Sequence, residues 1–129
     1  MIELDHLIVP AANARAAAER LAGLLGLPHG PAAAGPFHAV YLSASLTLDF
    51  DTWPAPVPAL HFALRVDDAT FDALVARLRA AGVALRSHPH GPEDGRVGEH
   101  GGGRLVYWND PAPHVWELLT VSYARQPAA

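Results

Sequence analysis

The stretch LDHLIV at residues 4–9 has a counterpart in the stretch LHFALRV at residues 60–66. Both are rich in branched and aromatic apolar residues, a composition typical of buried β-strands. Each carries one histidine at the same point, His6 in the first stretch and His61 in the second. Each then runs into an alanine- and leucine-rich stretch with helical character. The sequence therefore indicates an internal duplication of one structural unit.

The two copies also end alike, with an aromatic strand, a turn and an acidic strand. Tyr41 precedes Asp49 in the first copy, and Tyr107 precedes Glu117 in the second. Duplication supplies a two-fold arrangement in which matched positions converge on one point. Two histidines and a carboxylate that converge in this way indicate a metal site.

Length and composition limit the classes of protein. The 129 residues, 50% of them hydrophobic, are enough for one domain with a real core. The formal net charge of −4 is spread along the chain without a basic stripe, which argues against a nucleic-acid partner. No apolar run approaches a membrane span and the start is strand-like rather than a signal peptide, so we expect a cytoplasmic protein with no membrane partner. Because the chain has no cysteine, nitrogen and oxygen atoms must hold any metal.

The first module, about residues 1–53, is expected to follow the order β-α-β-β-β. Asn13 is a good helix cap, and Gly26 with Pro28 stops the helix that follows. The proline-rich segment 54–58 is a stiff linker and the natural boundary of the module. The expected strands cover residues 2–9, 37–43 and 45–51, and residues 29–36 form a loop with room for a short irregular strand.

The second module, about residues 59–123, repeats this order. Asp67 or Asp68 caps a helix that Gly82 ends. A polar, glycine-rich loop spans residues 88–103. The expected strands cover residues 59–66, 83–87, 104–109 and 114–121, and residues 124–129 form a tail.

Alternation along the strands predicts which side chains share a face. On the last strand Glu117 points away from Trp116 and Leu118. Asp49 likewise points away from the apolar residues beside it. If the helices cover the apolar faces, these acids and the two histidines line the opposite face. Two neutral imidazoles and one carboxylate would leave open positions on a divalent ion, which suits Fe(II), Mn(II), Ni(II) or catalytic Zn(II).

A structural interpretation competes with the metal site. A single histidine in a half-buried strand is more often a hydrogen-bonded core residue than a ligand. Glu117 alone could be a surface carboxylate. The histidines occupy the same position in both copies, and acids stand on both closing strands. This repetition favours the metal site, because its chemistry needs all three residues together.

Two segments resemble the vicinal oxygen chelate superfamily, which includes glyoxalase I, extradiol dioxygenases, fosfomycin-resistance thiol transferases, methylmalonyl-CoA epimerase and metal-free bleomycin-binding proteins. One segment is LDHL at residues 4–7, and the other runs from VYWNDP at residues 106–111 to HVWEL at residues 114–118. The second is similar to the family's aromatic-x-Asp-Pro-x-Gly-His-x-x-Glu segment, although Pro113 or Ala112 replaces the glycine. The resemblance covers essentially the whole chain.

The resemblance implies an α+β fold in which two βαβββ modules form a cup-shaped mixed sheet, usually in a homodimer. It places the ligands of one divalent metal ion at His6, His61 and Glu117. Fe2+ is the favoured ion, with Zn2+, Ni2+ or Mn2+ as alternatives. The substrate would be a small molecule whose two neighbouring oxygens chelate the ion.

The branch of the superfamily stays open, with a slight preference for ring cleavage by a dioxygenase over a glyoxalase-like lyase or isomerase. Tyr107 lies ten residues before Glu117, the spacing of an active-site tyrosine in extradiol dioxygenases, and His100 stands on the preceding loop as in those enzymes. Both would assist proton transfer, although Tyr107 could equally serve sheet packing. Asp49 occupies the position of the fourth ligand in glyoxalase I, where it would be a ligand or a base.

Arg104, Trp53 and Trp108 are the candidates for substrate binding. Residues 88–103 could form a glycine-hinged lid, with Arg104 holding a substrate carboxylate or phosphate, or they could be an ordinary surface loop. Trp53 and Trp108 could line the pocket or pack in the core. A binding protein without catalysis and a metal-bound sensor are the competing classes. The intact set of two histidines and a glutamate favours an enzyme.

Overall fold

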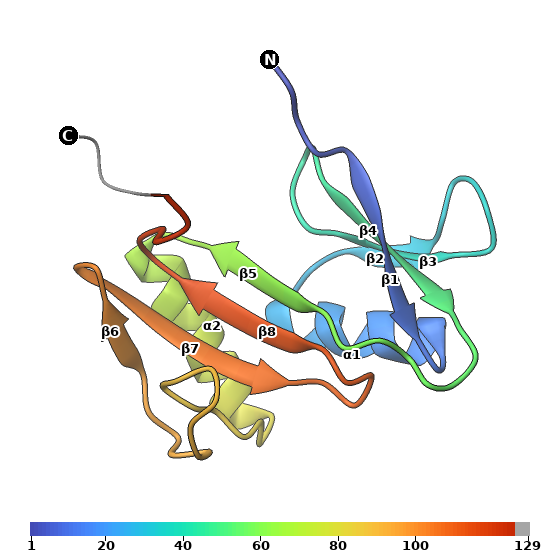
Figure 1. Cartoon of the computed structure of the whole chain (residues 1–129). Helices are drawn as coiled ribbons and strands as arrows, with labels where there is room; N and C mark the ends of the chain where they lie inside the picture. Colours follow the sequence, from blue (N-terminus) through green and yellow to red (C-terminus); the bar gives the residue numbers. More distant parts are fainter. Residues whose placement is uncertain (126–129) are drawn as a thin grey trace. The chain divides into compact units, whose positions relative to one another are not determined.

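Each half of the chain folds as a strand, a helix and three further strands (Figure 1). The computed structural model describes residues 1–125. Two βαβββ modules in one chain make an α+β fold, which confirms the fold class predicted from the sequence. The cup shape depends on how the two modules are arranged, and it stays a prediction. No helix within the described residues is long and apolar enough to span a membrane.

The described chain divides into two compact units. One unit holds Met1–Ala59 with Pro111–Pro113, and the other holds Leu60–Asp110 with the chain from His114 onward. The tail expected over residues 124–129 lies, from residue 126 on, outside the described residues.

The first unit consists of β1 (His6–Ala11), α1 (Ala14–Leu25), β2 (His29–Pro31), β3 (His38–Tyr41) and β4 (Thr47–Thr52). Its strands lie in the order β1-β4-β3-β2. β1 is parallel to β4, and the other neighbours are antiparallel. Parallel neighbours need a long connection, which α1 and the following strands provide.

Local signals set both ends of α1. The side-chain oxygen of Asn13 accepts a hydrogen bond from the backbone N–H of Ala16 at 3.0 Å, which caps the first turn. Gly26 follows the helix with a φ of 67°, a left-handed conformation that glycine adopts without strain. Both signals stand in the sequence, and the helix begins and ends where they predict.

The second unit consists of β5 (His61–Arg65), α2 (Asp68–Ala80), β6 (Gly98–His100), β7 (Gly103–Asn109) and β8 (Val115–Leu119). Its strand order, β5-β8-β7-β6, repeats that of the first unit, and β5 is again parallel to β8. The carboxylate of Asp67 accepts a hydrogen bond from the N–H of Thr70 at 2.7 Å and caps α2. The duplication read from the sequence is therefore a duplication of topology.

Three expected boundaries differ from the structure. The strand predicted over residues 83–87 shortens to one bridge, in which Arg86 pairs with Tyr107. The predicted loop over residues 88–103 contains β6, which pairs with β7 along the same edge as that bridge. The first strand begins at His6 rather than residue 2, because its ladder with β4 starts there.

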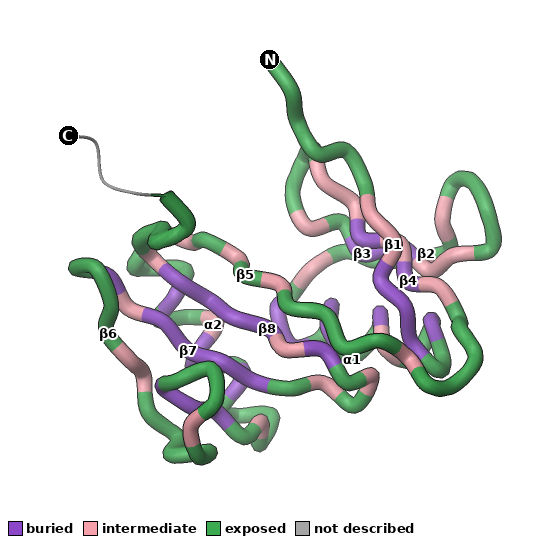
Figure 2. The backbone as a smooth tube through the Cα atoms, in the orientation of Figure 1, coloured by how far each residue is buried: buried purple, intermediate pink, exposed green. Residues whose placement is uncertain are grey.

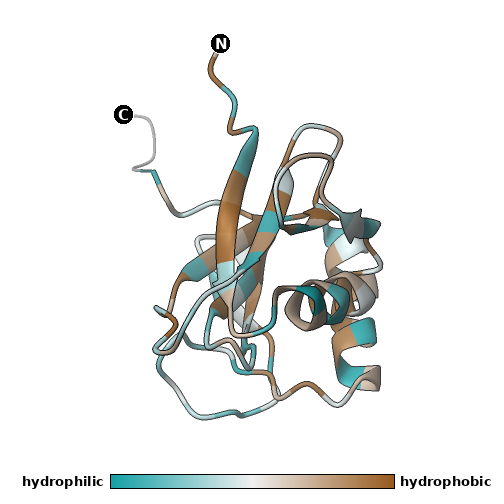
Figure 3. Cartoon of the chain, turned by 90° about the vertical axis from the view of Figure 1, so that its right-hand side faces the viewer, coloured by the Kyte–Doolittle hydropathy of each residue, from teal (hydrophilic) through white to brown (hydrophobic). Residues whose placement is uncertain are grey.

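The core of the second unit lies between α2 and one face of the sheet. Figure 2 shows β7 and β8 largely buried, while the edge strand β6 is more exposed. The fully buried side chains of β7 and β8 on this face are those of Val106, Trp108, Trp116 and Leu118. Hydrophobic and hydrophilic segments alternate along the helices (Figure 3), as expected for helices that cover a sheet. The other face of the sheet is left for Glu117 and its neighbours.

Replacing Asn13 tests the cap of α1. We expect Asn13→Ala to lower the free energy of unfolding by about 1 kcal/mol, because it leaves the N–H of Ala16 without its side-chain acceptor. Urea unfolding followed by circular dichroism measures the change. Asn13→Asp keeps an acceptor and is the matched control, with an expected change under about 0.5 kcal/mol. Equal losses in both variants would contradict the capping role.

Candidate functional site

His61 and Glu117 come together on one face of the second sheet. The parallel ladder pairs His61 with Val115 and Ala63 with Glu117, so the histidine and the acid stand one diagonal step apart. Nε2 of His61 lies 3.1 Å from Oε1 of Glu117. Strand register thus brings two of the predicted metal ligands into contact.

The hydrogen bonds of His61 make this contact suitable for a cation. Its Nδ1 lies 3.0 Å from the carbonyl oxygen of Val115. Since a carbonyl only accepts, Nδ1 carries the proton, and Nε2 of the neutral ring is an acceptor. Two acceptors, Nε2 and Oε1 of Glu117, then face each other at 3.1 Å. Either a proton on Nε2 or a metal ion held by both atoms can join them, and an anchored Nδ1 is typical of metal-binding histidines.

Glu117 is a buried carboxylate that a tyrosine hydroxyl covers. Its side chain is 0% exposed. The hydroxyl of Tyr123 lies 2.6 Å from Oε1 and 2.8 Å from Oε2 and donates its proton to this pair. A buried carboxylate is costly unless it is hydrogen-bonded or paired. The hydroxyl of Tyr123 meets part of that need, and the contact with His61 adds to it only when a proton or a cation lies between Nε2 and Oε1.

No role was predicted for Tyr123 from the sequence. The chain leaves regular strand structure after Leu119, so no ladder indicated where the tyrosine lies. One signal was present: Tyr123 is an even number of residues from Glu117, and continued alternation would put both on one face. The expected end of the strand at residue 121 hid that signal.

Tyr107 and His100 lie on the same face as Glu117. Tyr107 is directly opposite Glu117 in the ladder of β7 and β8. Its hydroxyl is 3.5 Å from that of Tyr123, and its ring is 6.3 Å from the ring of His61. The ring of His100 meets the ring of Tyr123 edge-on at 5.1 Å. Both residues predicted to assist proton transfer are therefore beside the candidate ligands, and their catalytic roles stay predictions.

Burial and the carboxylate keep both phenols protonated. Burial raises the pKa of Tyr107 above its ordinary value, and the charge of Glu117 adds to the effect. Tyr123 is 42% exposed as a whole, but withdrawal of its hydroxyl from water raises its pKa, and the hydrogen bond to Glu117 raises that pKa further. Two neutral O–H groups thus stand next to the carboxylate as hydrogen-bond donors.

The first unit carries a second histidine and acid on one face of its sheet. β1 and β4 pair His6 with Thr47 and Ile8 with Asp49. Nδ1 of His6 lies 2.7 Å from the carboxylate of Asp5, which leaves Nε2 as the nitrogen for a metal. The hydrogen bond to Asp5, together with the charges of Asp5 and Asp49, raises the pKa of His6.

A groove of about 400 Å³ lies beside His6 and Asp49. Its other lining residues are Asp5, Ala32, Ala33, Ala34, Gly35, Phe37, Ala39, Tyr41 and Thr47. Gly35 has a φ of 78°, and a Cβ there would lie 2.5 Å from the ring of Phe37. The glycine therefore lets the apolar loop close on the groove, which offers a polar end and an apolar wall in one place.

The two ladders match position by position. His6 pairs with Thr47 and Asp49 follows two residues later, just as His61 pairs with Val115 and Glu117 follows two residues later. Asp49 is thus the counterpart of Glu117.

The matching of Tyr41 with Tyr107 was wrong. Tyr107 is opposite Glu117, but Tyr41 is opposite Thr47, and Ala39 stands opposite Asp49. Tyr41 therefore lies two residues away from the position that corresponds to Tyr107. Glu117 has a tyrosine opposite it in the ladder, and Asp49 does not.

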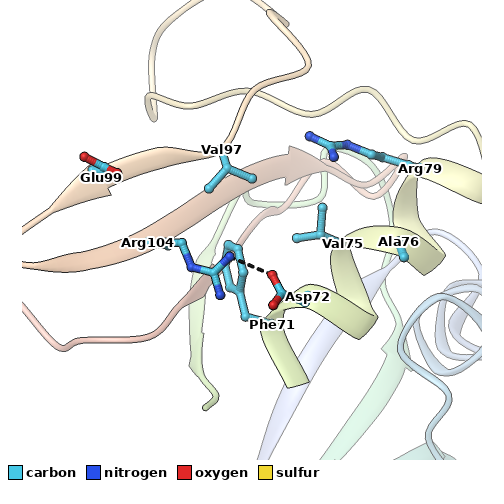
Figure 4. Close-up of a pocket in the computed structure, with 8 residues that line it drawn as sticks. All are labelled: Phe71, Asp72, Val75, Ala76, Arg79, Val97, Glu99 and Arg104. Atoms are coloured by element: carbon cyan, nitrogen blue, oxygen red, sulfur yellow. Dashed lines mark hydrogen bonds and ion pairs between the residues drawn. The ribbon is translucent and has the colours of Figure 1, made fainter. Parts of the chain in front are cut away.

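Arg104 lies on the face of the sheet that packs against α2, not on the face of Glu117 (Figure 4). Its guanidinium lies 2.6 Å from the carboxylate of Asp72 and 3.0 Å from that of Asp68, and it stacks 4.6 Å over Phe71. These contacts attach the first turn of α2 to β7. Alternation points the side chain of Arg104 away from Glu117, so it cannot hold a substrate carboxylate or phosphate beside that acid. A substrate-binding role elsewhere for Arg104 stays a prediction.

The two candidate tryptophans have different positions. Trp108 is 0% exposed in the core, on the face opposite Glu117, so of its two expected places the structure has the core and not the pocket. Trp53 belongs to the first unit and is 39% exposed. Its indole N–H donates to Asp51 at 2.9 Å. A substrate-binding role for Trp53 stays a prediction.

Hydrogen bonds hold the loop that follows the expected strand at residues 83–87, and its role as a lid stays a prediction. The carboxylate of Asp94 accepts hydrogen bonds from the N–H and the hydroxyl of Ser87, at 3.1 and 2.5 Å, and from the N–H of Arg96. Arg79 of α2 donates to the carbonyl of Gly95 at 3.1 Å. These hydrogen bonds tie the loop to itself and to the helix.

The motif that carries the family resemblance builds the turn before β8. The carboxylate of Asp110 accepts hydrogen bonds from the N–H of His114 at 2.8 Å and from the indole of Trp116 at 2.7 Å. Nδ1 of the fully buried His114 accepts from the N–H of Leu60 at 3.0 Å. The motif thus joins the start of β5 to β8 and supports the pairing of His61 with Glu117.

The three predicted metal ligands belong to different units. His6 is part of the first unit, while His61 and Glu117 are part of the second. Within residues 1–125 no group of three His, Asp or Glu side chains is gathered as a metal-binding cluster. The three-residue ligand set therefore stays a prediction, and the contact of His61 with Glu117 is the part that the structure describes.

Comparison with solved structures places this fold in one family. No protein-family model and no curated protein matches the chain. Among solved structures, oxidase ChaP-H1 is 38% identical over 97% of this chain and 100% of that one, with a TM-score of 0.87. Oxidase ChaP-H2 is 33% identical over 95% and 96% of the two chains, also with a TM-score of 0.87. TnmS3, an antibiotic-binding protein from Streptomyces sp. CB03234, is 25% identical over 95% and 98%, with a TM-score of 0.70.

The chain belongs to the vicinal oxygen chelate superfamily, the glyoxalase, bleomycin resistance protein and dioxygenase family. The fold is shared with solved structures described as a glyoxalase/dioxygenase from Nostoc punctiforme and a lactoylglutathione lyase from Agrobacterium tumefaciens. The similarity to two oxidases over nearly the whole chain supports an enzyme.

Removing the hydroxyl of Tyr123 tests its contact with Glu117. We expect Tyr123→Phe to lower the free energy of unfolding of the metal-free protein by about 1–3 kcal/mol, because the buried carboxylate loses a donor. Urea unfolding after dialysis against a chelator measures the loss. Tyr41→Phe is the matched control, since Tyr41 is 40% exposed and lies in the other unit. A loss no larger than that of the control would contradict the assignment.

The raised pKa values of Tyr107 and Tyr123 predict their alkaline titration. Near pH 10, the ordinary pKa of tyrosine, the folded chain should keep two phenols protonated that ionise once it unfolds. The folded state then holds these protons more tightly, so their contribution to stability is complete below pH 10 and decreases as pH rises. Near-ultraviolet absorbance of the folded protein, compared with that of the protein in urea, measures how many phenols stay protonated on folding. Tyr123→Phe should reduce that number to about one; an unchanged number would contradict the assignment.

Proposed function

We propose that this protein is a mononuclear divalent-metal oxidoreductase of the vicinal oxygen chelate type. His6, His61 and Glu117 would hold the ion, and a small substrate would chelate it through two neighbouring oxygens. The observation that carries the proposal is the contact of His61 Nε2 with Glu117 Oε1 at 3.1 Å, two acceptors that a metal ion would join.

The relatives support oxidation over other chemistry of the family. ChaP-H1 and ChaP-H2 are both described as oxidases, at 38% and 33% identity. Two histidines with one carboxylate form the ligand set of non-haem Fe(II) oxygenases, so Fe2+ is the favoured ion. Zn2+, Ni2+ and Mn2+ remain compatible with the same donors. We favour ring cleavage of the extradiol type.

In this proposal the residues around Glu117 would transfer protons and exclude water. A bound divalent ion would supply positive charge to stabilise the substrate oxygens as they become anionic. Tyr107 would donate a proton from its hydroxyl, which burial keeps protonated. His100, whose ring centre lies 5.1 Å from that of Tyr123, would accept or return a proton. Leu105 and Leu119 make the wall around Tyr107 apolar.

A lyase or isomerase of the glyoxalase kind is the second candidate. One observation favours it: Asp49 occupies the same ladder position as Glu117, two residues beyond the partner of the histidine. A carboxylate there could serve as a fourth ligand or as a base through water. The side chain of Asp49 lines an open groove, so a substrate could reach it.

A binding protein without catalysis is the third candidate. TnmS3, at 25% identity, is described as an antibiotic-binding protein. The groove beside His6, with its apolar wall, would suit a drug or metabolite. This candidate predicts binding without turnover. For all three we propose a homodimer in the cytoplasm with a small-molecule ligand.

Metal content tests the proposed site directly. We expect about one equivalent of divalent metal per chain in the gently purified protein, measured by elemental analysis, because the proposed ligand set holds one ion. Glu117→Ala should lose it, with at least a tenfold weaker affinity on reloading. Glu99→Ala is the matched control, because Glu99 is an exposed acid of β6 paired with Arg104 on the opposite face.

Two outcomes would change the assignment. No metal in the wild type, even after anaerobic loading with Fe(II), Ni(II) and Zn(II), would overturn the metalloenzyme and leave the binding protein. Metal without oxygen uptake on any catechol, but with isomerisation of a hemithioacetal, would favour the lyase. In that case Asp49→Asn should abolish turnover, whereas a ring-cleaving enzyme should tolerate it.

A further inference from the structure

Arg86 is a buried cation on the face that carries Glu117. It is 7% exposed. Its backbone exchanges two hydrogen bonds with Tyr107, at 3.0 and 2.9 Å, in an antiparallel bridge. Residues paired in this way point their side chains to one face. Since Tyr107 is opposite Glu117 in the next ladder, the three residues form one row across neighbouring strands.

The guanidinium of Arg86 has no carboxylate partner within the described residues. Its Nε donates to the carbonyl of Pro89 at 3.2 Å, and its Nη1 donates to the side-chain oxygen of Asn109 at 2.6 Å. Both acceptors are neutral. Arg15 and Arg104, by contrast, each form ion pairs with carboxylates. A buried charge without a counter-charge destabilises the fold, and a bound anion would offset that cost.

The free edge of the guanidinium suits a carboxylate. Arginine has five N–H groups, and the two contacts above use one on Nε and one on Nη1. The remaining N–H groups, on Nη1 and Nη2, form the parallel pair that binds a carboxylate with two hydrogen bonds. Nε1 of Trp108 is the one buried polar side-chain atom without a partner in the described chain. Nη2 of Arg86 makes neither of the two hydrogen bonds above and is not such an atom, so it is in contact with solvent.

We propose that Arg86 is the subsite for a substrate carboxylate at the end of the molecule opposite its metal-chelating oxygens. This inference rests on the proposed function. Neighbouring strands are about 4.8 Å apart, so the backbones of Arg86 and Glu117 are separated by roughly 10 Å of sheet with Tyr107 between them. A substrate laid along this row would place its neighbouring oxygens at Glu117 and its ring over Tyr107. The substrate class is therefore an acidic catechol or a related vicinal diol or enediol with a short acidic arm.

The apolar surroundings of the row support a flat, unsaturated body for that substrate. Leu105, Tyr107 and Leu119 form a buried cluster on this face, and Val115 packs against it. An apolar wall between a cation at one end and a metal-binding carboxylate at the other selects for a molecule with an apolar middle and two polar ends.

Equilibrium binding of two matched catechols tests the subsite without relying on turnover. Dihydrocaffeate carries a propanoate arm, and its methyl ester is the same molecule without the charge. We would measure both dissociation constants by calorimetry on the full chain loaded with Zn2+, after determining metal content in the same sample. The wild type should bind the acid at least tenfold more tightly than the ester. Arg86→Gln should remove that preference, and Arg86→Lys should keep part of it.

Arg65→Gln is the matched control for loss of one positive charge. Arg65 pairs with Leu119, so it lies on the same face, but it is exposed and at the far strand β5. Its replacement should keep the preference for the acid. If it removes the preference as fully as Arg86→Gln does, the effect is one of net charge and the subsite is overturned.

The outcomes separate this inference from the proposed function. Metal-loaded wild type that binds acid and ester equally would overturn the subsite and leave the metal site standing. Wild type that takes up no metal would overturn the proposed function itself, and the subsite with it. The comparison of acid with ester needs no variant, so it decides the question even if Arg86→Gln does not fold.

Discussion

The parallel pairing of the first and last strands of each unit is the constraint on which the site depends. In both units a histidine begins the first strand, and the last strand carries an acid two residues beyond the histidine's partner. Because side chains alternate, a slip of one residue would send the acid into the face covered by the helix. The turn at Asp110, the buried His114 and the N–H of Leu60 hold this register in the second unit. The chemistry of His61 and Glu117 is thus decided by backbone register.

Burial of Glu117 explains why hydrogen-bonding side chains surround it. A carboxylate that is 0% exposed must receive hydrogen bonds or a cation. The hydroxyl of Tyr123 and the ring of His61 meet part of that need, and a metal ion would meet the rest. The same burial raises the pKa of Tyr107, which keeps a proton donor beside the carboxylate. One buried charge therefore organises the phenols around it.

Sequence pattern predicted what local rules determine. The caps at Asn13 and Asp67 and the alternation around Glu117 are set within a few residues of chain, and the structure agrees with them. The ion pairs of Arg104 were not predicted, because its partners Asp68 and Asp72 lie more than thirty residues earlier in the chain, on a helix. Tyr123 was missed because the segment after β8 reaches Glu117 without a ladder. Contacts between distant segments follow from packing, which no local pattern encodes.

Divergence between the two copies gives Glu117 and Asp49 different surroundings. Glu117 has a tyrosine opposite it and a second tyrosine over it, and it is sealed from water. Asp49 has Ala39 opposite it and lines an open groove. A buried, hydrogen-bonded carboxylate is held in one orientation, which suits a ligand that must position an ion. An open carboxylate can exchange protons with water or contact a substrate. The duplication supplied two equivalent positions, and the residues across the ladder made one rigid and left the other accessible.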